Sequence, residues 1–196
     1  EIQYVGGKID GDVNYYEDGV LWSGLTFSND QIKKYKYYDK DKKMISEGAE
    51  KNGTLKLNSF YLSGAKLRER TYINGISEGI CTTWYENGNL KSEENYKDDE
   101  LEGKQTYYDK SGKLYSEFQY KNGNADGYGV EYYKNGVISN QGWFINDIKR
   151  GEWIKYSPNG IITESNYYQN NELQGPSINY DLTGKMEAAF MFSEGQ

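Results

Sequence analysis

The sequence predicts an all-β protein: an elongated, single-layer antiparallel meander of about eight stacked β-hairpin repeats. Three observations lead to this prediction. Glycines recur at a step of 24 residues, an aromatic residue recurs in the same register, and the chain holds 23 glycines but only 2 prolines. Glycine supplies the positive φ angles of tight turns, and few prolines leave the backbone donors free for strand pairing.

Three series share the 24-residue step. One runs Gly64, Gly88, Gly112, Gly136, Gly160 and Gly184. The second runs Gly79, Gly103, Gly127, Gly151 and Gly175. The aromatic series runs Phe60, Trp84, Tyr108, Tyr132, Tyr156 and Tyr180. A fixed period indicates stacked supersecondary units. We predict a single array over 1–196, with regular repeats in 55–196 and irregular ones in 10–54.

The irregular repeats still match the regular ones. "YYDKDKKMISEGAEKNG", from Tyr37 to Gly53, resembles "YYDKSGKLYSEFQYKNG", from Tyr107 to Gly123, at an offset of 70 residues. The earlier copy has Lys42 where the other repeats have the turn glycine.

Positions within a repeat are counted from its first glycine as 0, so that Trp84 is at +5 and the turn glycine Gly88 at +9. The turn accepts Pro158, and its second central position holds Asn, Ser or Thr. This favours a three-residue loop, a type I turn followed by glycine in the left-handed conformation, which pairs +5 with +11. The third repeat has Lys66 at +11, so a bulge or an irregular hairpin is expected there.

An aromatic residue at +5, an aliphatic one at +11 and an aromatic one at +17 recur through the array. All three offsets are odd, and alternate residues of a strand share a face. We therefore expect these side chains to form the packed face of a twisted ribbon.

A second tyrosine often adjoins position +5 and should point to the opposite, polar face. These candidate binding residues are Tyr16, Tyr37, Tyr61, Tyr85, Tyr107 and Tyr133. An exposed tyrosine row could recognise a protein, a peptide or a glycan, since tyrosine offers a large contact area at low entropic cost. The simpler and favoured alternative is cross-strand stabilisation by a residue of high β-propensity.

The chain has no histidine and one cysteine, Cys81. This composition excludes a Ser/His/Asp triad and the usual zinc ligand sets, so no catalytic residue, metal or cofactor is expected and the protein is predicted not to be an enzyme. Cys81 is expected to be a half-buried strand residue.

The net charge of −7 argues against nucleic acid and anionic membrane lipid as partners. One basic cluster, formed by Lys33, Lys34, Lys36, Lys40, Lys42 and Lys43, is interpreted as the solvated part of a hairpin.

"EGKQTYYDKSGKLYSEFQYKNG" and "RGEWIKYSPNGIITESNYYQNN" resemble the bacterial variant of the MORN repeat. The resemblance implies an extended, grooved sheet of hairpins. Bacterial members are often labelled YwqK-like antitoxins, and eukaryotic arrays are linked to scaffolding and membrane lipids. We expect a bacterial scaffold that binds a macromolecule, foremost a protein, along its sheet. The alternative is an antitoxin or immunity protein, with lipid or glycan binding ranked lower. Both a cytoplasmic location and export after loss of a leader remain open, as does the oligomeric state.

Overall fold

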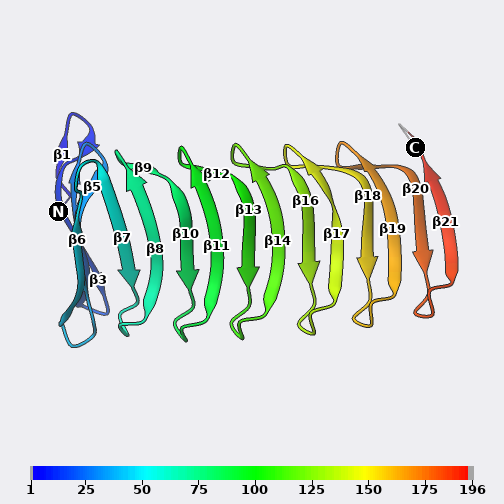
Figure 1. The fold of residues 1–196 in the computed structure, drawn as a ribbon, viewed down its shortest axis with the longest axis horizontal. Helices are drawn as coiled ribbons and strands as arrows, with labels where there is room; N and C mark the ends of the chain where they lie inside the picture. Colours follow the sequence, from blue (N-terminus) through cyan, green and yellow to red (C-terminus); the bar gives the residue numbers. More distant parts are fainter. Residues whose placement is uncertain (1, 194–196) are drawn as a thin grey trace. The chain divides into compact units, whose positions relative to one another are not determined.

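The computed structural model describes residues 2–193, and the chain divides into an N-terminal unit, 1–99, and a C-terminal unit, 100–196. Strands and turns make up both units, and no helix in residues 2–193 is long and apolar enough to cross a membrane. The expected all-β architecture of antiparallel hairpins is confirmed, and each unit is described by itself below (Figure 1).

The N-terminal unit begins with a short ribbon of β1 (Tyr4–Val5) and β2 (Lys8–Ile9). A four-stranded sheet follows, made of β3 (Gly11–Glu17), β4 (Val20–Ser28), β5 (Gln31–Tyr38) and β6 (Met44–Ala49). The next hairpins comprise β7 (Thr54–Phe60), β8 (Lys66–Ile73), β9 (Ile76–Ser77), β10 (Gly79–Trp84) and β11 (Leu90–Lys97).

The main apolar cluster of this unit lies where β5 meets β7. Tyr35 and Tyr37 pack with Leu55 and Leu57, and all four are at most 7% exposed. The Trp22 indole N–H adds a 2.7 Å hydrogen bond to the backbone carbonyl of Phe60. Two tyrosine rings are thus part of the buried core of this unit.

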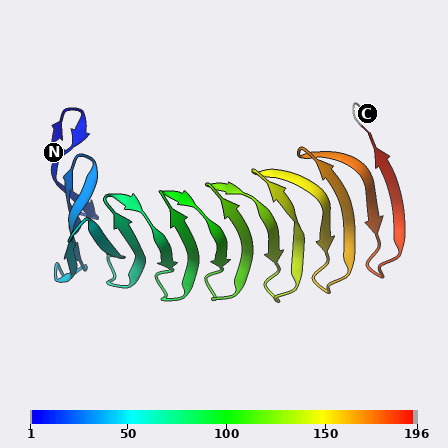
Figure 2. The same ribbon diagram turned by 45° about the horizontal axis from the view of Figure 1, so that its top comes forward.

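The C-terminal unit is a meander in which successive hairpins pair in chain order (Figure 1). Its strands are β12 (Glu100–Leu101), β13 (Gly103–Tyr108), β14 (Leu114–Lys121), β15 (Asn124–Ala125), β16 (Gly127–Tyr132), β17 (Ile138–Ile145), β18 (Ile148–Tyr156), β19 (Ile162–Gln169), β20 (Glu172–Tyr180) and β21 (Met186–Phe192). These strands curve along their length (Figure 2).

The predicted three-residue loop is confirmed. In the fourth repeat Gly88 N–H donates to the Tyr85 carbonyl at 2.9 Å and has φ +86°, while Tyr85 N–H donates to the Asn89 carbonyl at 2.8 Å. Lys42 adopts the same left-handed conformation without being glycine, at φ +60°. The first repeat differs, because Asp18 and Gly19 form a two-residue turn with two positive φ angles.

The pairing of +5 with +11 is also confirmed, as in Trp84 with Leu90. Phe60 pairs with Lys66 in the same register, so the third hairpin is regular. In each case the register shifts beside +5: Thr83, at +4, pairs with Ser92, at +13, so residue +12 is an extra, bulged residue.

The expectation that +5, +11 and +17 share the packed face is wrong, and this bulge is the reason. It reverses the alternation, so that +5 and +11 lie on one face while +13, +15 and +17 lie on the other with 0, +2 and +4. We call these the outer and inner faces. The most buried strand residues of the repeats belong to the inner face, among them Leu55, Leu57, Cys81, Ser92, Gln105, Ser116 and Trp153.

The second glycine series has a packing role on the inner face. In successive hairpins the glycine at 0 lies directly opposite the aromatic residue at +17, as in Gly103 with Tyr120 and Gly151 with Tyr168. These glycines have positive φ angles, +76° and +75°. Together with the bulges, they interrupt regular strand geometry and account for the curvature.

Candidate functional site

The six candidate tyrosines do not form one exposed row. Tyr61 and Tyr133, at +6, lie just beyond their strands, and each hydroxyl donates to the backbone carbonyl at +5 of the next repeat. Tyr61 reaches Trp84 at 3.0 Å, and Tyr133 reaches Tyr156 at 2.7 Å. Tyr85 occupies the same position and has the Lys91 ammonium 5.8 Å from its ring centroid. Position +6 therefore joins neighbouring repeats.

The other three candidates lie in different environments. Tyr37, at +4, is on the inner face, 5% exposed, and donates a 3.0 Å hydrogen bond to the Ser59 hydroxyl. Burial raises the pKa of Tyr37. Tyr107 is half-buried at the same position, and Tyr16 is 64% exposed beside the first turn. The expectation of outward exposure is thus wrong for Tyr37, because β5 packs against β7 on that side.

The inner face of the C-terminal unit contains a groove over β16 to β19. It arises where two glycines, Gly129 and Gly142, pair directly across β16 and β17. Rings from adjacent strands lean over them: a Cβ on Gly142 would lie 2.3 Å from the Trp153 ring, and one on Gly129 would lie 2.7 Å from Phe118. The missing side chains therefore make room for an aromatic floor.

The floor is a chain of edge-on and tilted ring contacts. Ring centroids are 6.1 Å apart for Phe118 and Phe144, 4.9 Å for Phe144 and Trp153, and 6.5 Å for Trp153 and Tyr168. The Lys149 ammonium lies 4.2 Å from the Trp153 centroid and 5.3 Å from that of Tyr168. This part of the groove already holds a cation against aromatic rings.

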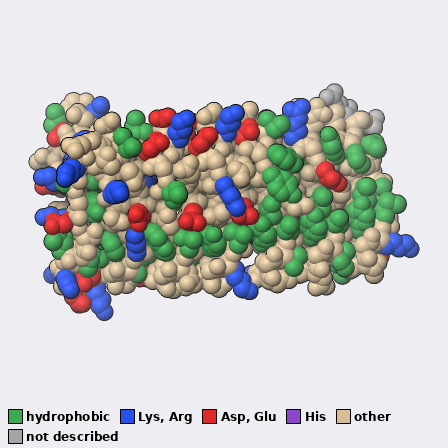
Figure 3. All heavy atoms as spheres, in the orientation of Figure 1, with side chains coloured by type: hydrophobic (Ala, Val, Ile, Leu, Met, Phe, Trp, Pro, Cys, Tyr) green, Lys and Arg blue, Asp and Glu red, His purple; other side chains and the backbone are tan. Residues whose placement is uncertain are grey.

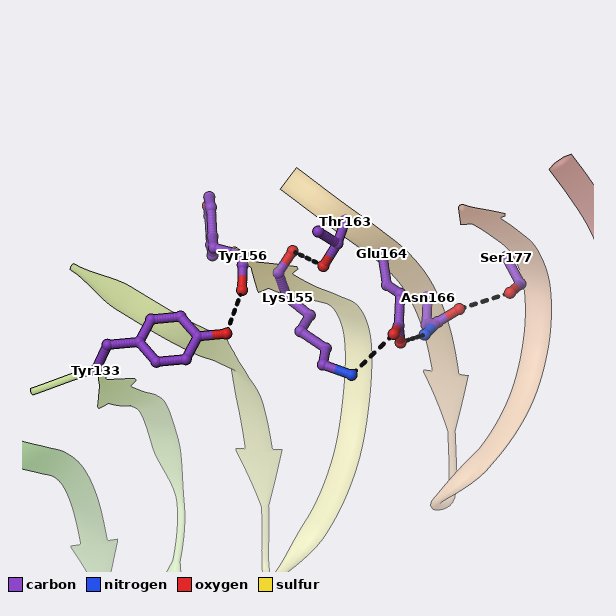
Figure 4. Close-up of polar contacts among 7 residues, drawn as sticks. All are labelled: Tyr133, Lys155, Tyr156, Thr163, Glu164, Asn166 and Ser177. Atoms are coloured by element: carbon purple, nitrogen blue, oxygen red, sulfur yellow. Dashed lines mark hydrogen bonds and ion pairs between the residues drawn. The ribbon is translucent and has the colours of Figure 1, made fainter. Parts of the chain in front are cut away.

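Along part of the groove wall, the polar side chains bond to one another (Figure 4). The Lys155 ammonium contacts the Glu164 carboxylate at 2.9 Å, and the amide of Asn166 donates to the other oxygen at 3.5 Å. The Ser177 hydroxyl then donates to the Asn166 side-chain oxygen at 2.6 Å. Since each member has a partner, this part of the wall offers few free groups to a ligand.

The adjoining part of this wall, where Asn140 lies opposite Lys155 across β17 and β18, has unused hydrogen-bonding groups. Glu131 and Asn140 face each other across β16 and β17, and within the described part of the chain neither side chain has a hydrogen bond or an ion pair. Both line a cavity of about 340 Å³ together with Lys149, Trp153 and Tyr168. A free carboxylate, a free amide and an aromatic floor thus meet in one hollow.

The outer face of the same unit carries an exposed apolar patch. We call it the outer patch, made of Tyr128, Trp143, Ile145, Ile148, Tyr167 and Met191. The ring centroids of Tyr128 and Trp143 are 5.5 Å apart, and the Trp143 side chain is 55% exposed. Hydrophobic side chains gather over β16–β21 in the space-filling view (Figure 3).

Elsewhere the structure offers little for catalysis or metal binding. No group of three or more potential metal ligands occurs among residues 2–193. Cys81 is 2% exposed, more buried than expected, and burial raises the pKa of its thiol. A cysteine of this kind is a weak nucleophile.

The sequence predicts a grooved sheet but neither the position and lining of this groove nor the outer patch. A signal for the groove was present, since glycine stands at both +2 and +15 of one repeat, at Gly129 and Gly142. The outer patch had a weaker signal: the cross-strand pair at +1 and +16 changes from Lys104 and Gln119 to Tyr128 and Trp143.

Comparison with known proteins agrees with the repeat pattern. The family model of the MORN repeat variant matches residues 77–98, 101–122 and 149–171. No curated protein matches the chain. Among solved structures, a chain of the GtfA/B complex bound to UDP and GlcNAc is similar to this protein at 13% sequence identity and a TM-score of 0.26. The match covers 58% of this chain and 22% of the GtfA/B chain. With the hairpin register described above, the three family matches show that the chain contains MORN repeats of the variant type.

Proposed function

We propose that the protein is a non-enzymatic scaffold that binds another protein through the outer patch. The observation that carries this proposal is the exposure of large apolar side chains on a sheet face open to solvent: 55% for Trp143, 44% for Tyr167 and 76% for Met191. Exposed apolar patches of this kind mark interaction sites, and Trp, Tyr and Met are enriched in interfaces.

The location of the patch supports a specific role. The preceding hairpin has Lys104 at the position of Tyr128 and Gln119 at that of Trp143, and Lys104 forms an ion pair with Glu117, which is typical of a solvated surface. One hairpin further, the exposed rings of Tyr128 and Trp143 replace these polar groups. We infer that the partner presents a complementary apolar surface.

Affinity capture from the native organism tests the proposal. The wild-type protein is compared with Trp143→Ser/Tyr167→Ser and with the control Tyr115→Ser, which removes another ring, 55% exposed, outside the patch. We expect a protein recovered by the wild type and the control but lost with the double variant. Equal recovery with all three, at unchanged melting temperature, would contradict the proposal.

A second candidate function is neutralisation of a basic toxic protein, favoured by the net charge of −7, which would steer a positively charged partner. Co-expression with the captured protein, should that protein be toxic alone, tests this narrower activity through rescue of growth. Growth arrest that persists on co-expression would exclude it for that partner.

A further inference from the structure

The inner groove of the C-terminal unit carries an inference independent of the outer patch. We propose that it is a binding site for an arginine side chain, presented by a peptide or protein segment. In this site the guanidinium lies over the Trp153 ring and donates hydrogen bonds to Glu131 and Asn140.

The free part of the groove wall sets the polarity of the ligand. Two other inner-face pairs at +4 and +13 satisfy each other, Thr83 with Ser92 at 2.6 Å and Lys155 with Glu164 at 2.9 Å. Glu131 and Asn140 form the equivalent pair but make no such contact within residues 2–193. A carboxylate is an acceptor only, and the amide oxygen is a second acceptor, so a donor-rich group matches this wall.

The aromatic floor sets the charge of the ligand. The Lys149 ammonium already lies 4.2 Å from the Trp153 centroid, which shows that a cation is accommodated there. Lys149 forms no ion pair within the described residues, and its ammonium is held by cation–π contacts with the Trp153 and Tyr168 rings. A competing cation that also pairs with Glu131 would displace it into solvent.

Arginine meets both requirements better than lysine. Its planar guanidinium stacks on aromatic rings and offers five donors that can bind a carboxylate through two parallel bonds. An ammonium group is not planar and does not present two parallel N–H donors to one carboxylate. The cavity of about 340 Å³ leaves room for such a side chain once Lys149 has moved.

Titration of the whole protein with the short peptide acetyl-Gly-Arg-Gly-amide tests the site. Binding is followed by NMR through the Asn140 side-chain amide and the Trp153 indole N–H. We expect both signals to shift and saturate, and Glu131→Gln to weaken binding by about tenfold, the loss of one charge-assisted contact. This variant should keep its fold because the Glu131 side chain has no intramolecular partner to lose. Glu152→Gln, at an exposed outer-face carboxylate of β18, is the matched control and should bind normally.

A second variant separates this site from an anion site. Lys149→Met removes the resident cation and should strengthen arginine binding by a few-fold, whereas an anion site would be lost with the lysine. The proposal is overturned if the citrulline peptide, which is neutral, binds as well as the arginine peptide, if Glu131→Gln has no effect, or if Lys149→Met abolishes binding. Capture through the outer patch can succeed or fail regardless of this result, since that experiment alters the opposite face.

Discussion

The Tyr133 hydroxyl donates a 2.7 Å hydrogen bond to the backbone carbonyl of Tyr156, 23 residues further along the chain (Figure 4). Tyr61 makes the same contact to Trp84 at 3.0 Å. The bond links the loop of one repeat to the strand end of the next, so position +6 stabilises the stacking of repeats. Stability in repeat proteins depends on such nearest-neighbour contacts.

Tyr133→Phe should therefore lower the free energy of unfolding by about 0.5–1.5 kcal/mol, the usual net contribution of one hydrogen bond. Urea denaturation followed by tryptophan fluorescence measures the change. Tyr167→Phe, which removes a hydroxyl from an exposed ring of the outer patch, is the control and should leave the midpoint unchanged. Equal midpoints for all three proteins would show that the Tyr133 contact contributes nothing.

Lys42 should gain stability from replacement by glycine. The Lys42 side chain at φ +60° costs on the order of 1–2 kcal/mol in steric strain, because the left-handed region disfavours a Cβ. Glycine removes this strain, but it also makes the unfolded chain more flexible, which lowers the free energy of unfolding and offsets part of the stabilisation. In urea denaturation we expect Lys42→Gly to raise the free energy of unfolding by roughly 0.5–1 kcal/mol.

The reciprocal change tests the same reasoning. Gly88 occupies the equivalent turn position at φ +86°, and a Cβ there would meet no atom within 4 Å. Gly88→Lys should consequently destabilise by about 0.5–1 kcal/mol, the backbone cost less the stabilisation from a less flexible unfolded chain. An unchanged free energy of unfolding for Gly88→Lys in chemical denaturation would contradict this backbone cost.

Much of the fold follows from the sequence because its signals are local. The step of 24 residues and the turn residues determine where the hairpins lie, and the loop type determines that +5 pairs with +11. The face assignment fails beyond that pair because the extra residue at +12, such as Lys91 or Ser139, has no distinctive side chain. A bulge of this kind depends on the backbone and leaves no residue-type signal.

The site was harder to predict for a related reason. The tyrosine doublet is conspicuous in the sequence, yet the hydroxyls of Tyr61 and Tyr133 are used between repeats. Glu131 and Asn140 are unremarkable as residue types, and their unsatisfied state emerges only when the cross-strand register is known. The binding surfaces proposed for this protein thus lie in departures from the repeat, and finding them requires the correct face assignment.

Gly142 is a further such departure, and its substitution should be costly. A Cβ at this position would lie 2.3 Å from the Trp153 ring, which cannot move freely because Phe144 contacts it at a centroid distance of 4.9 Å. Gly142→Ala should destabilise the protein by about 1–3 kcal/mol through overpacking. The control is Gly24→Ala, where the nearest atom is the flexible end of Asn14 at 3.0 Å, and its midpoint should change much less. Comparable losses for the two alanine variants in urea denaturation would contradict this view of the groove floor.

The Lys104–Glu117 pair should make stability depend on pH. The hydrogen bond from the Lys104 ammonium holds the pKa of Glu117 below its usual range, and the Tyr132 hydroxyl adds a 3.0 Å bond in the same direction. Because the folded-state pKa is lower than the unfolded one, the stabilisation is complete above the unfolded pKa and is lost as the pH falls through the folded pKa. Glu117 is partly exposed, so solvent screening limits the effect to about 1 kcal/mol or less. Lys104→Met should reduce the stability difference between pH 7 and pH 3, measured by urea denaturation. Lys121→Met, at an exposed lysine at the end of β14, is the control, and an unchanged difference in Lys104→Met would show that the pair does not contribute.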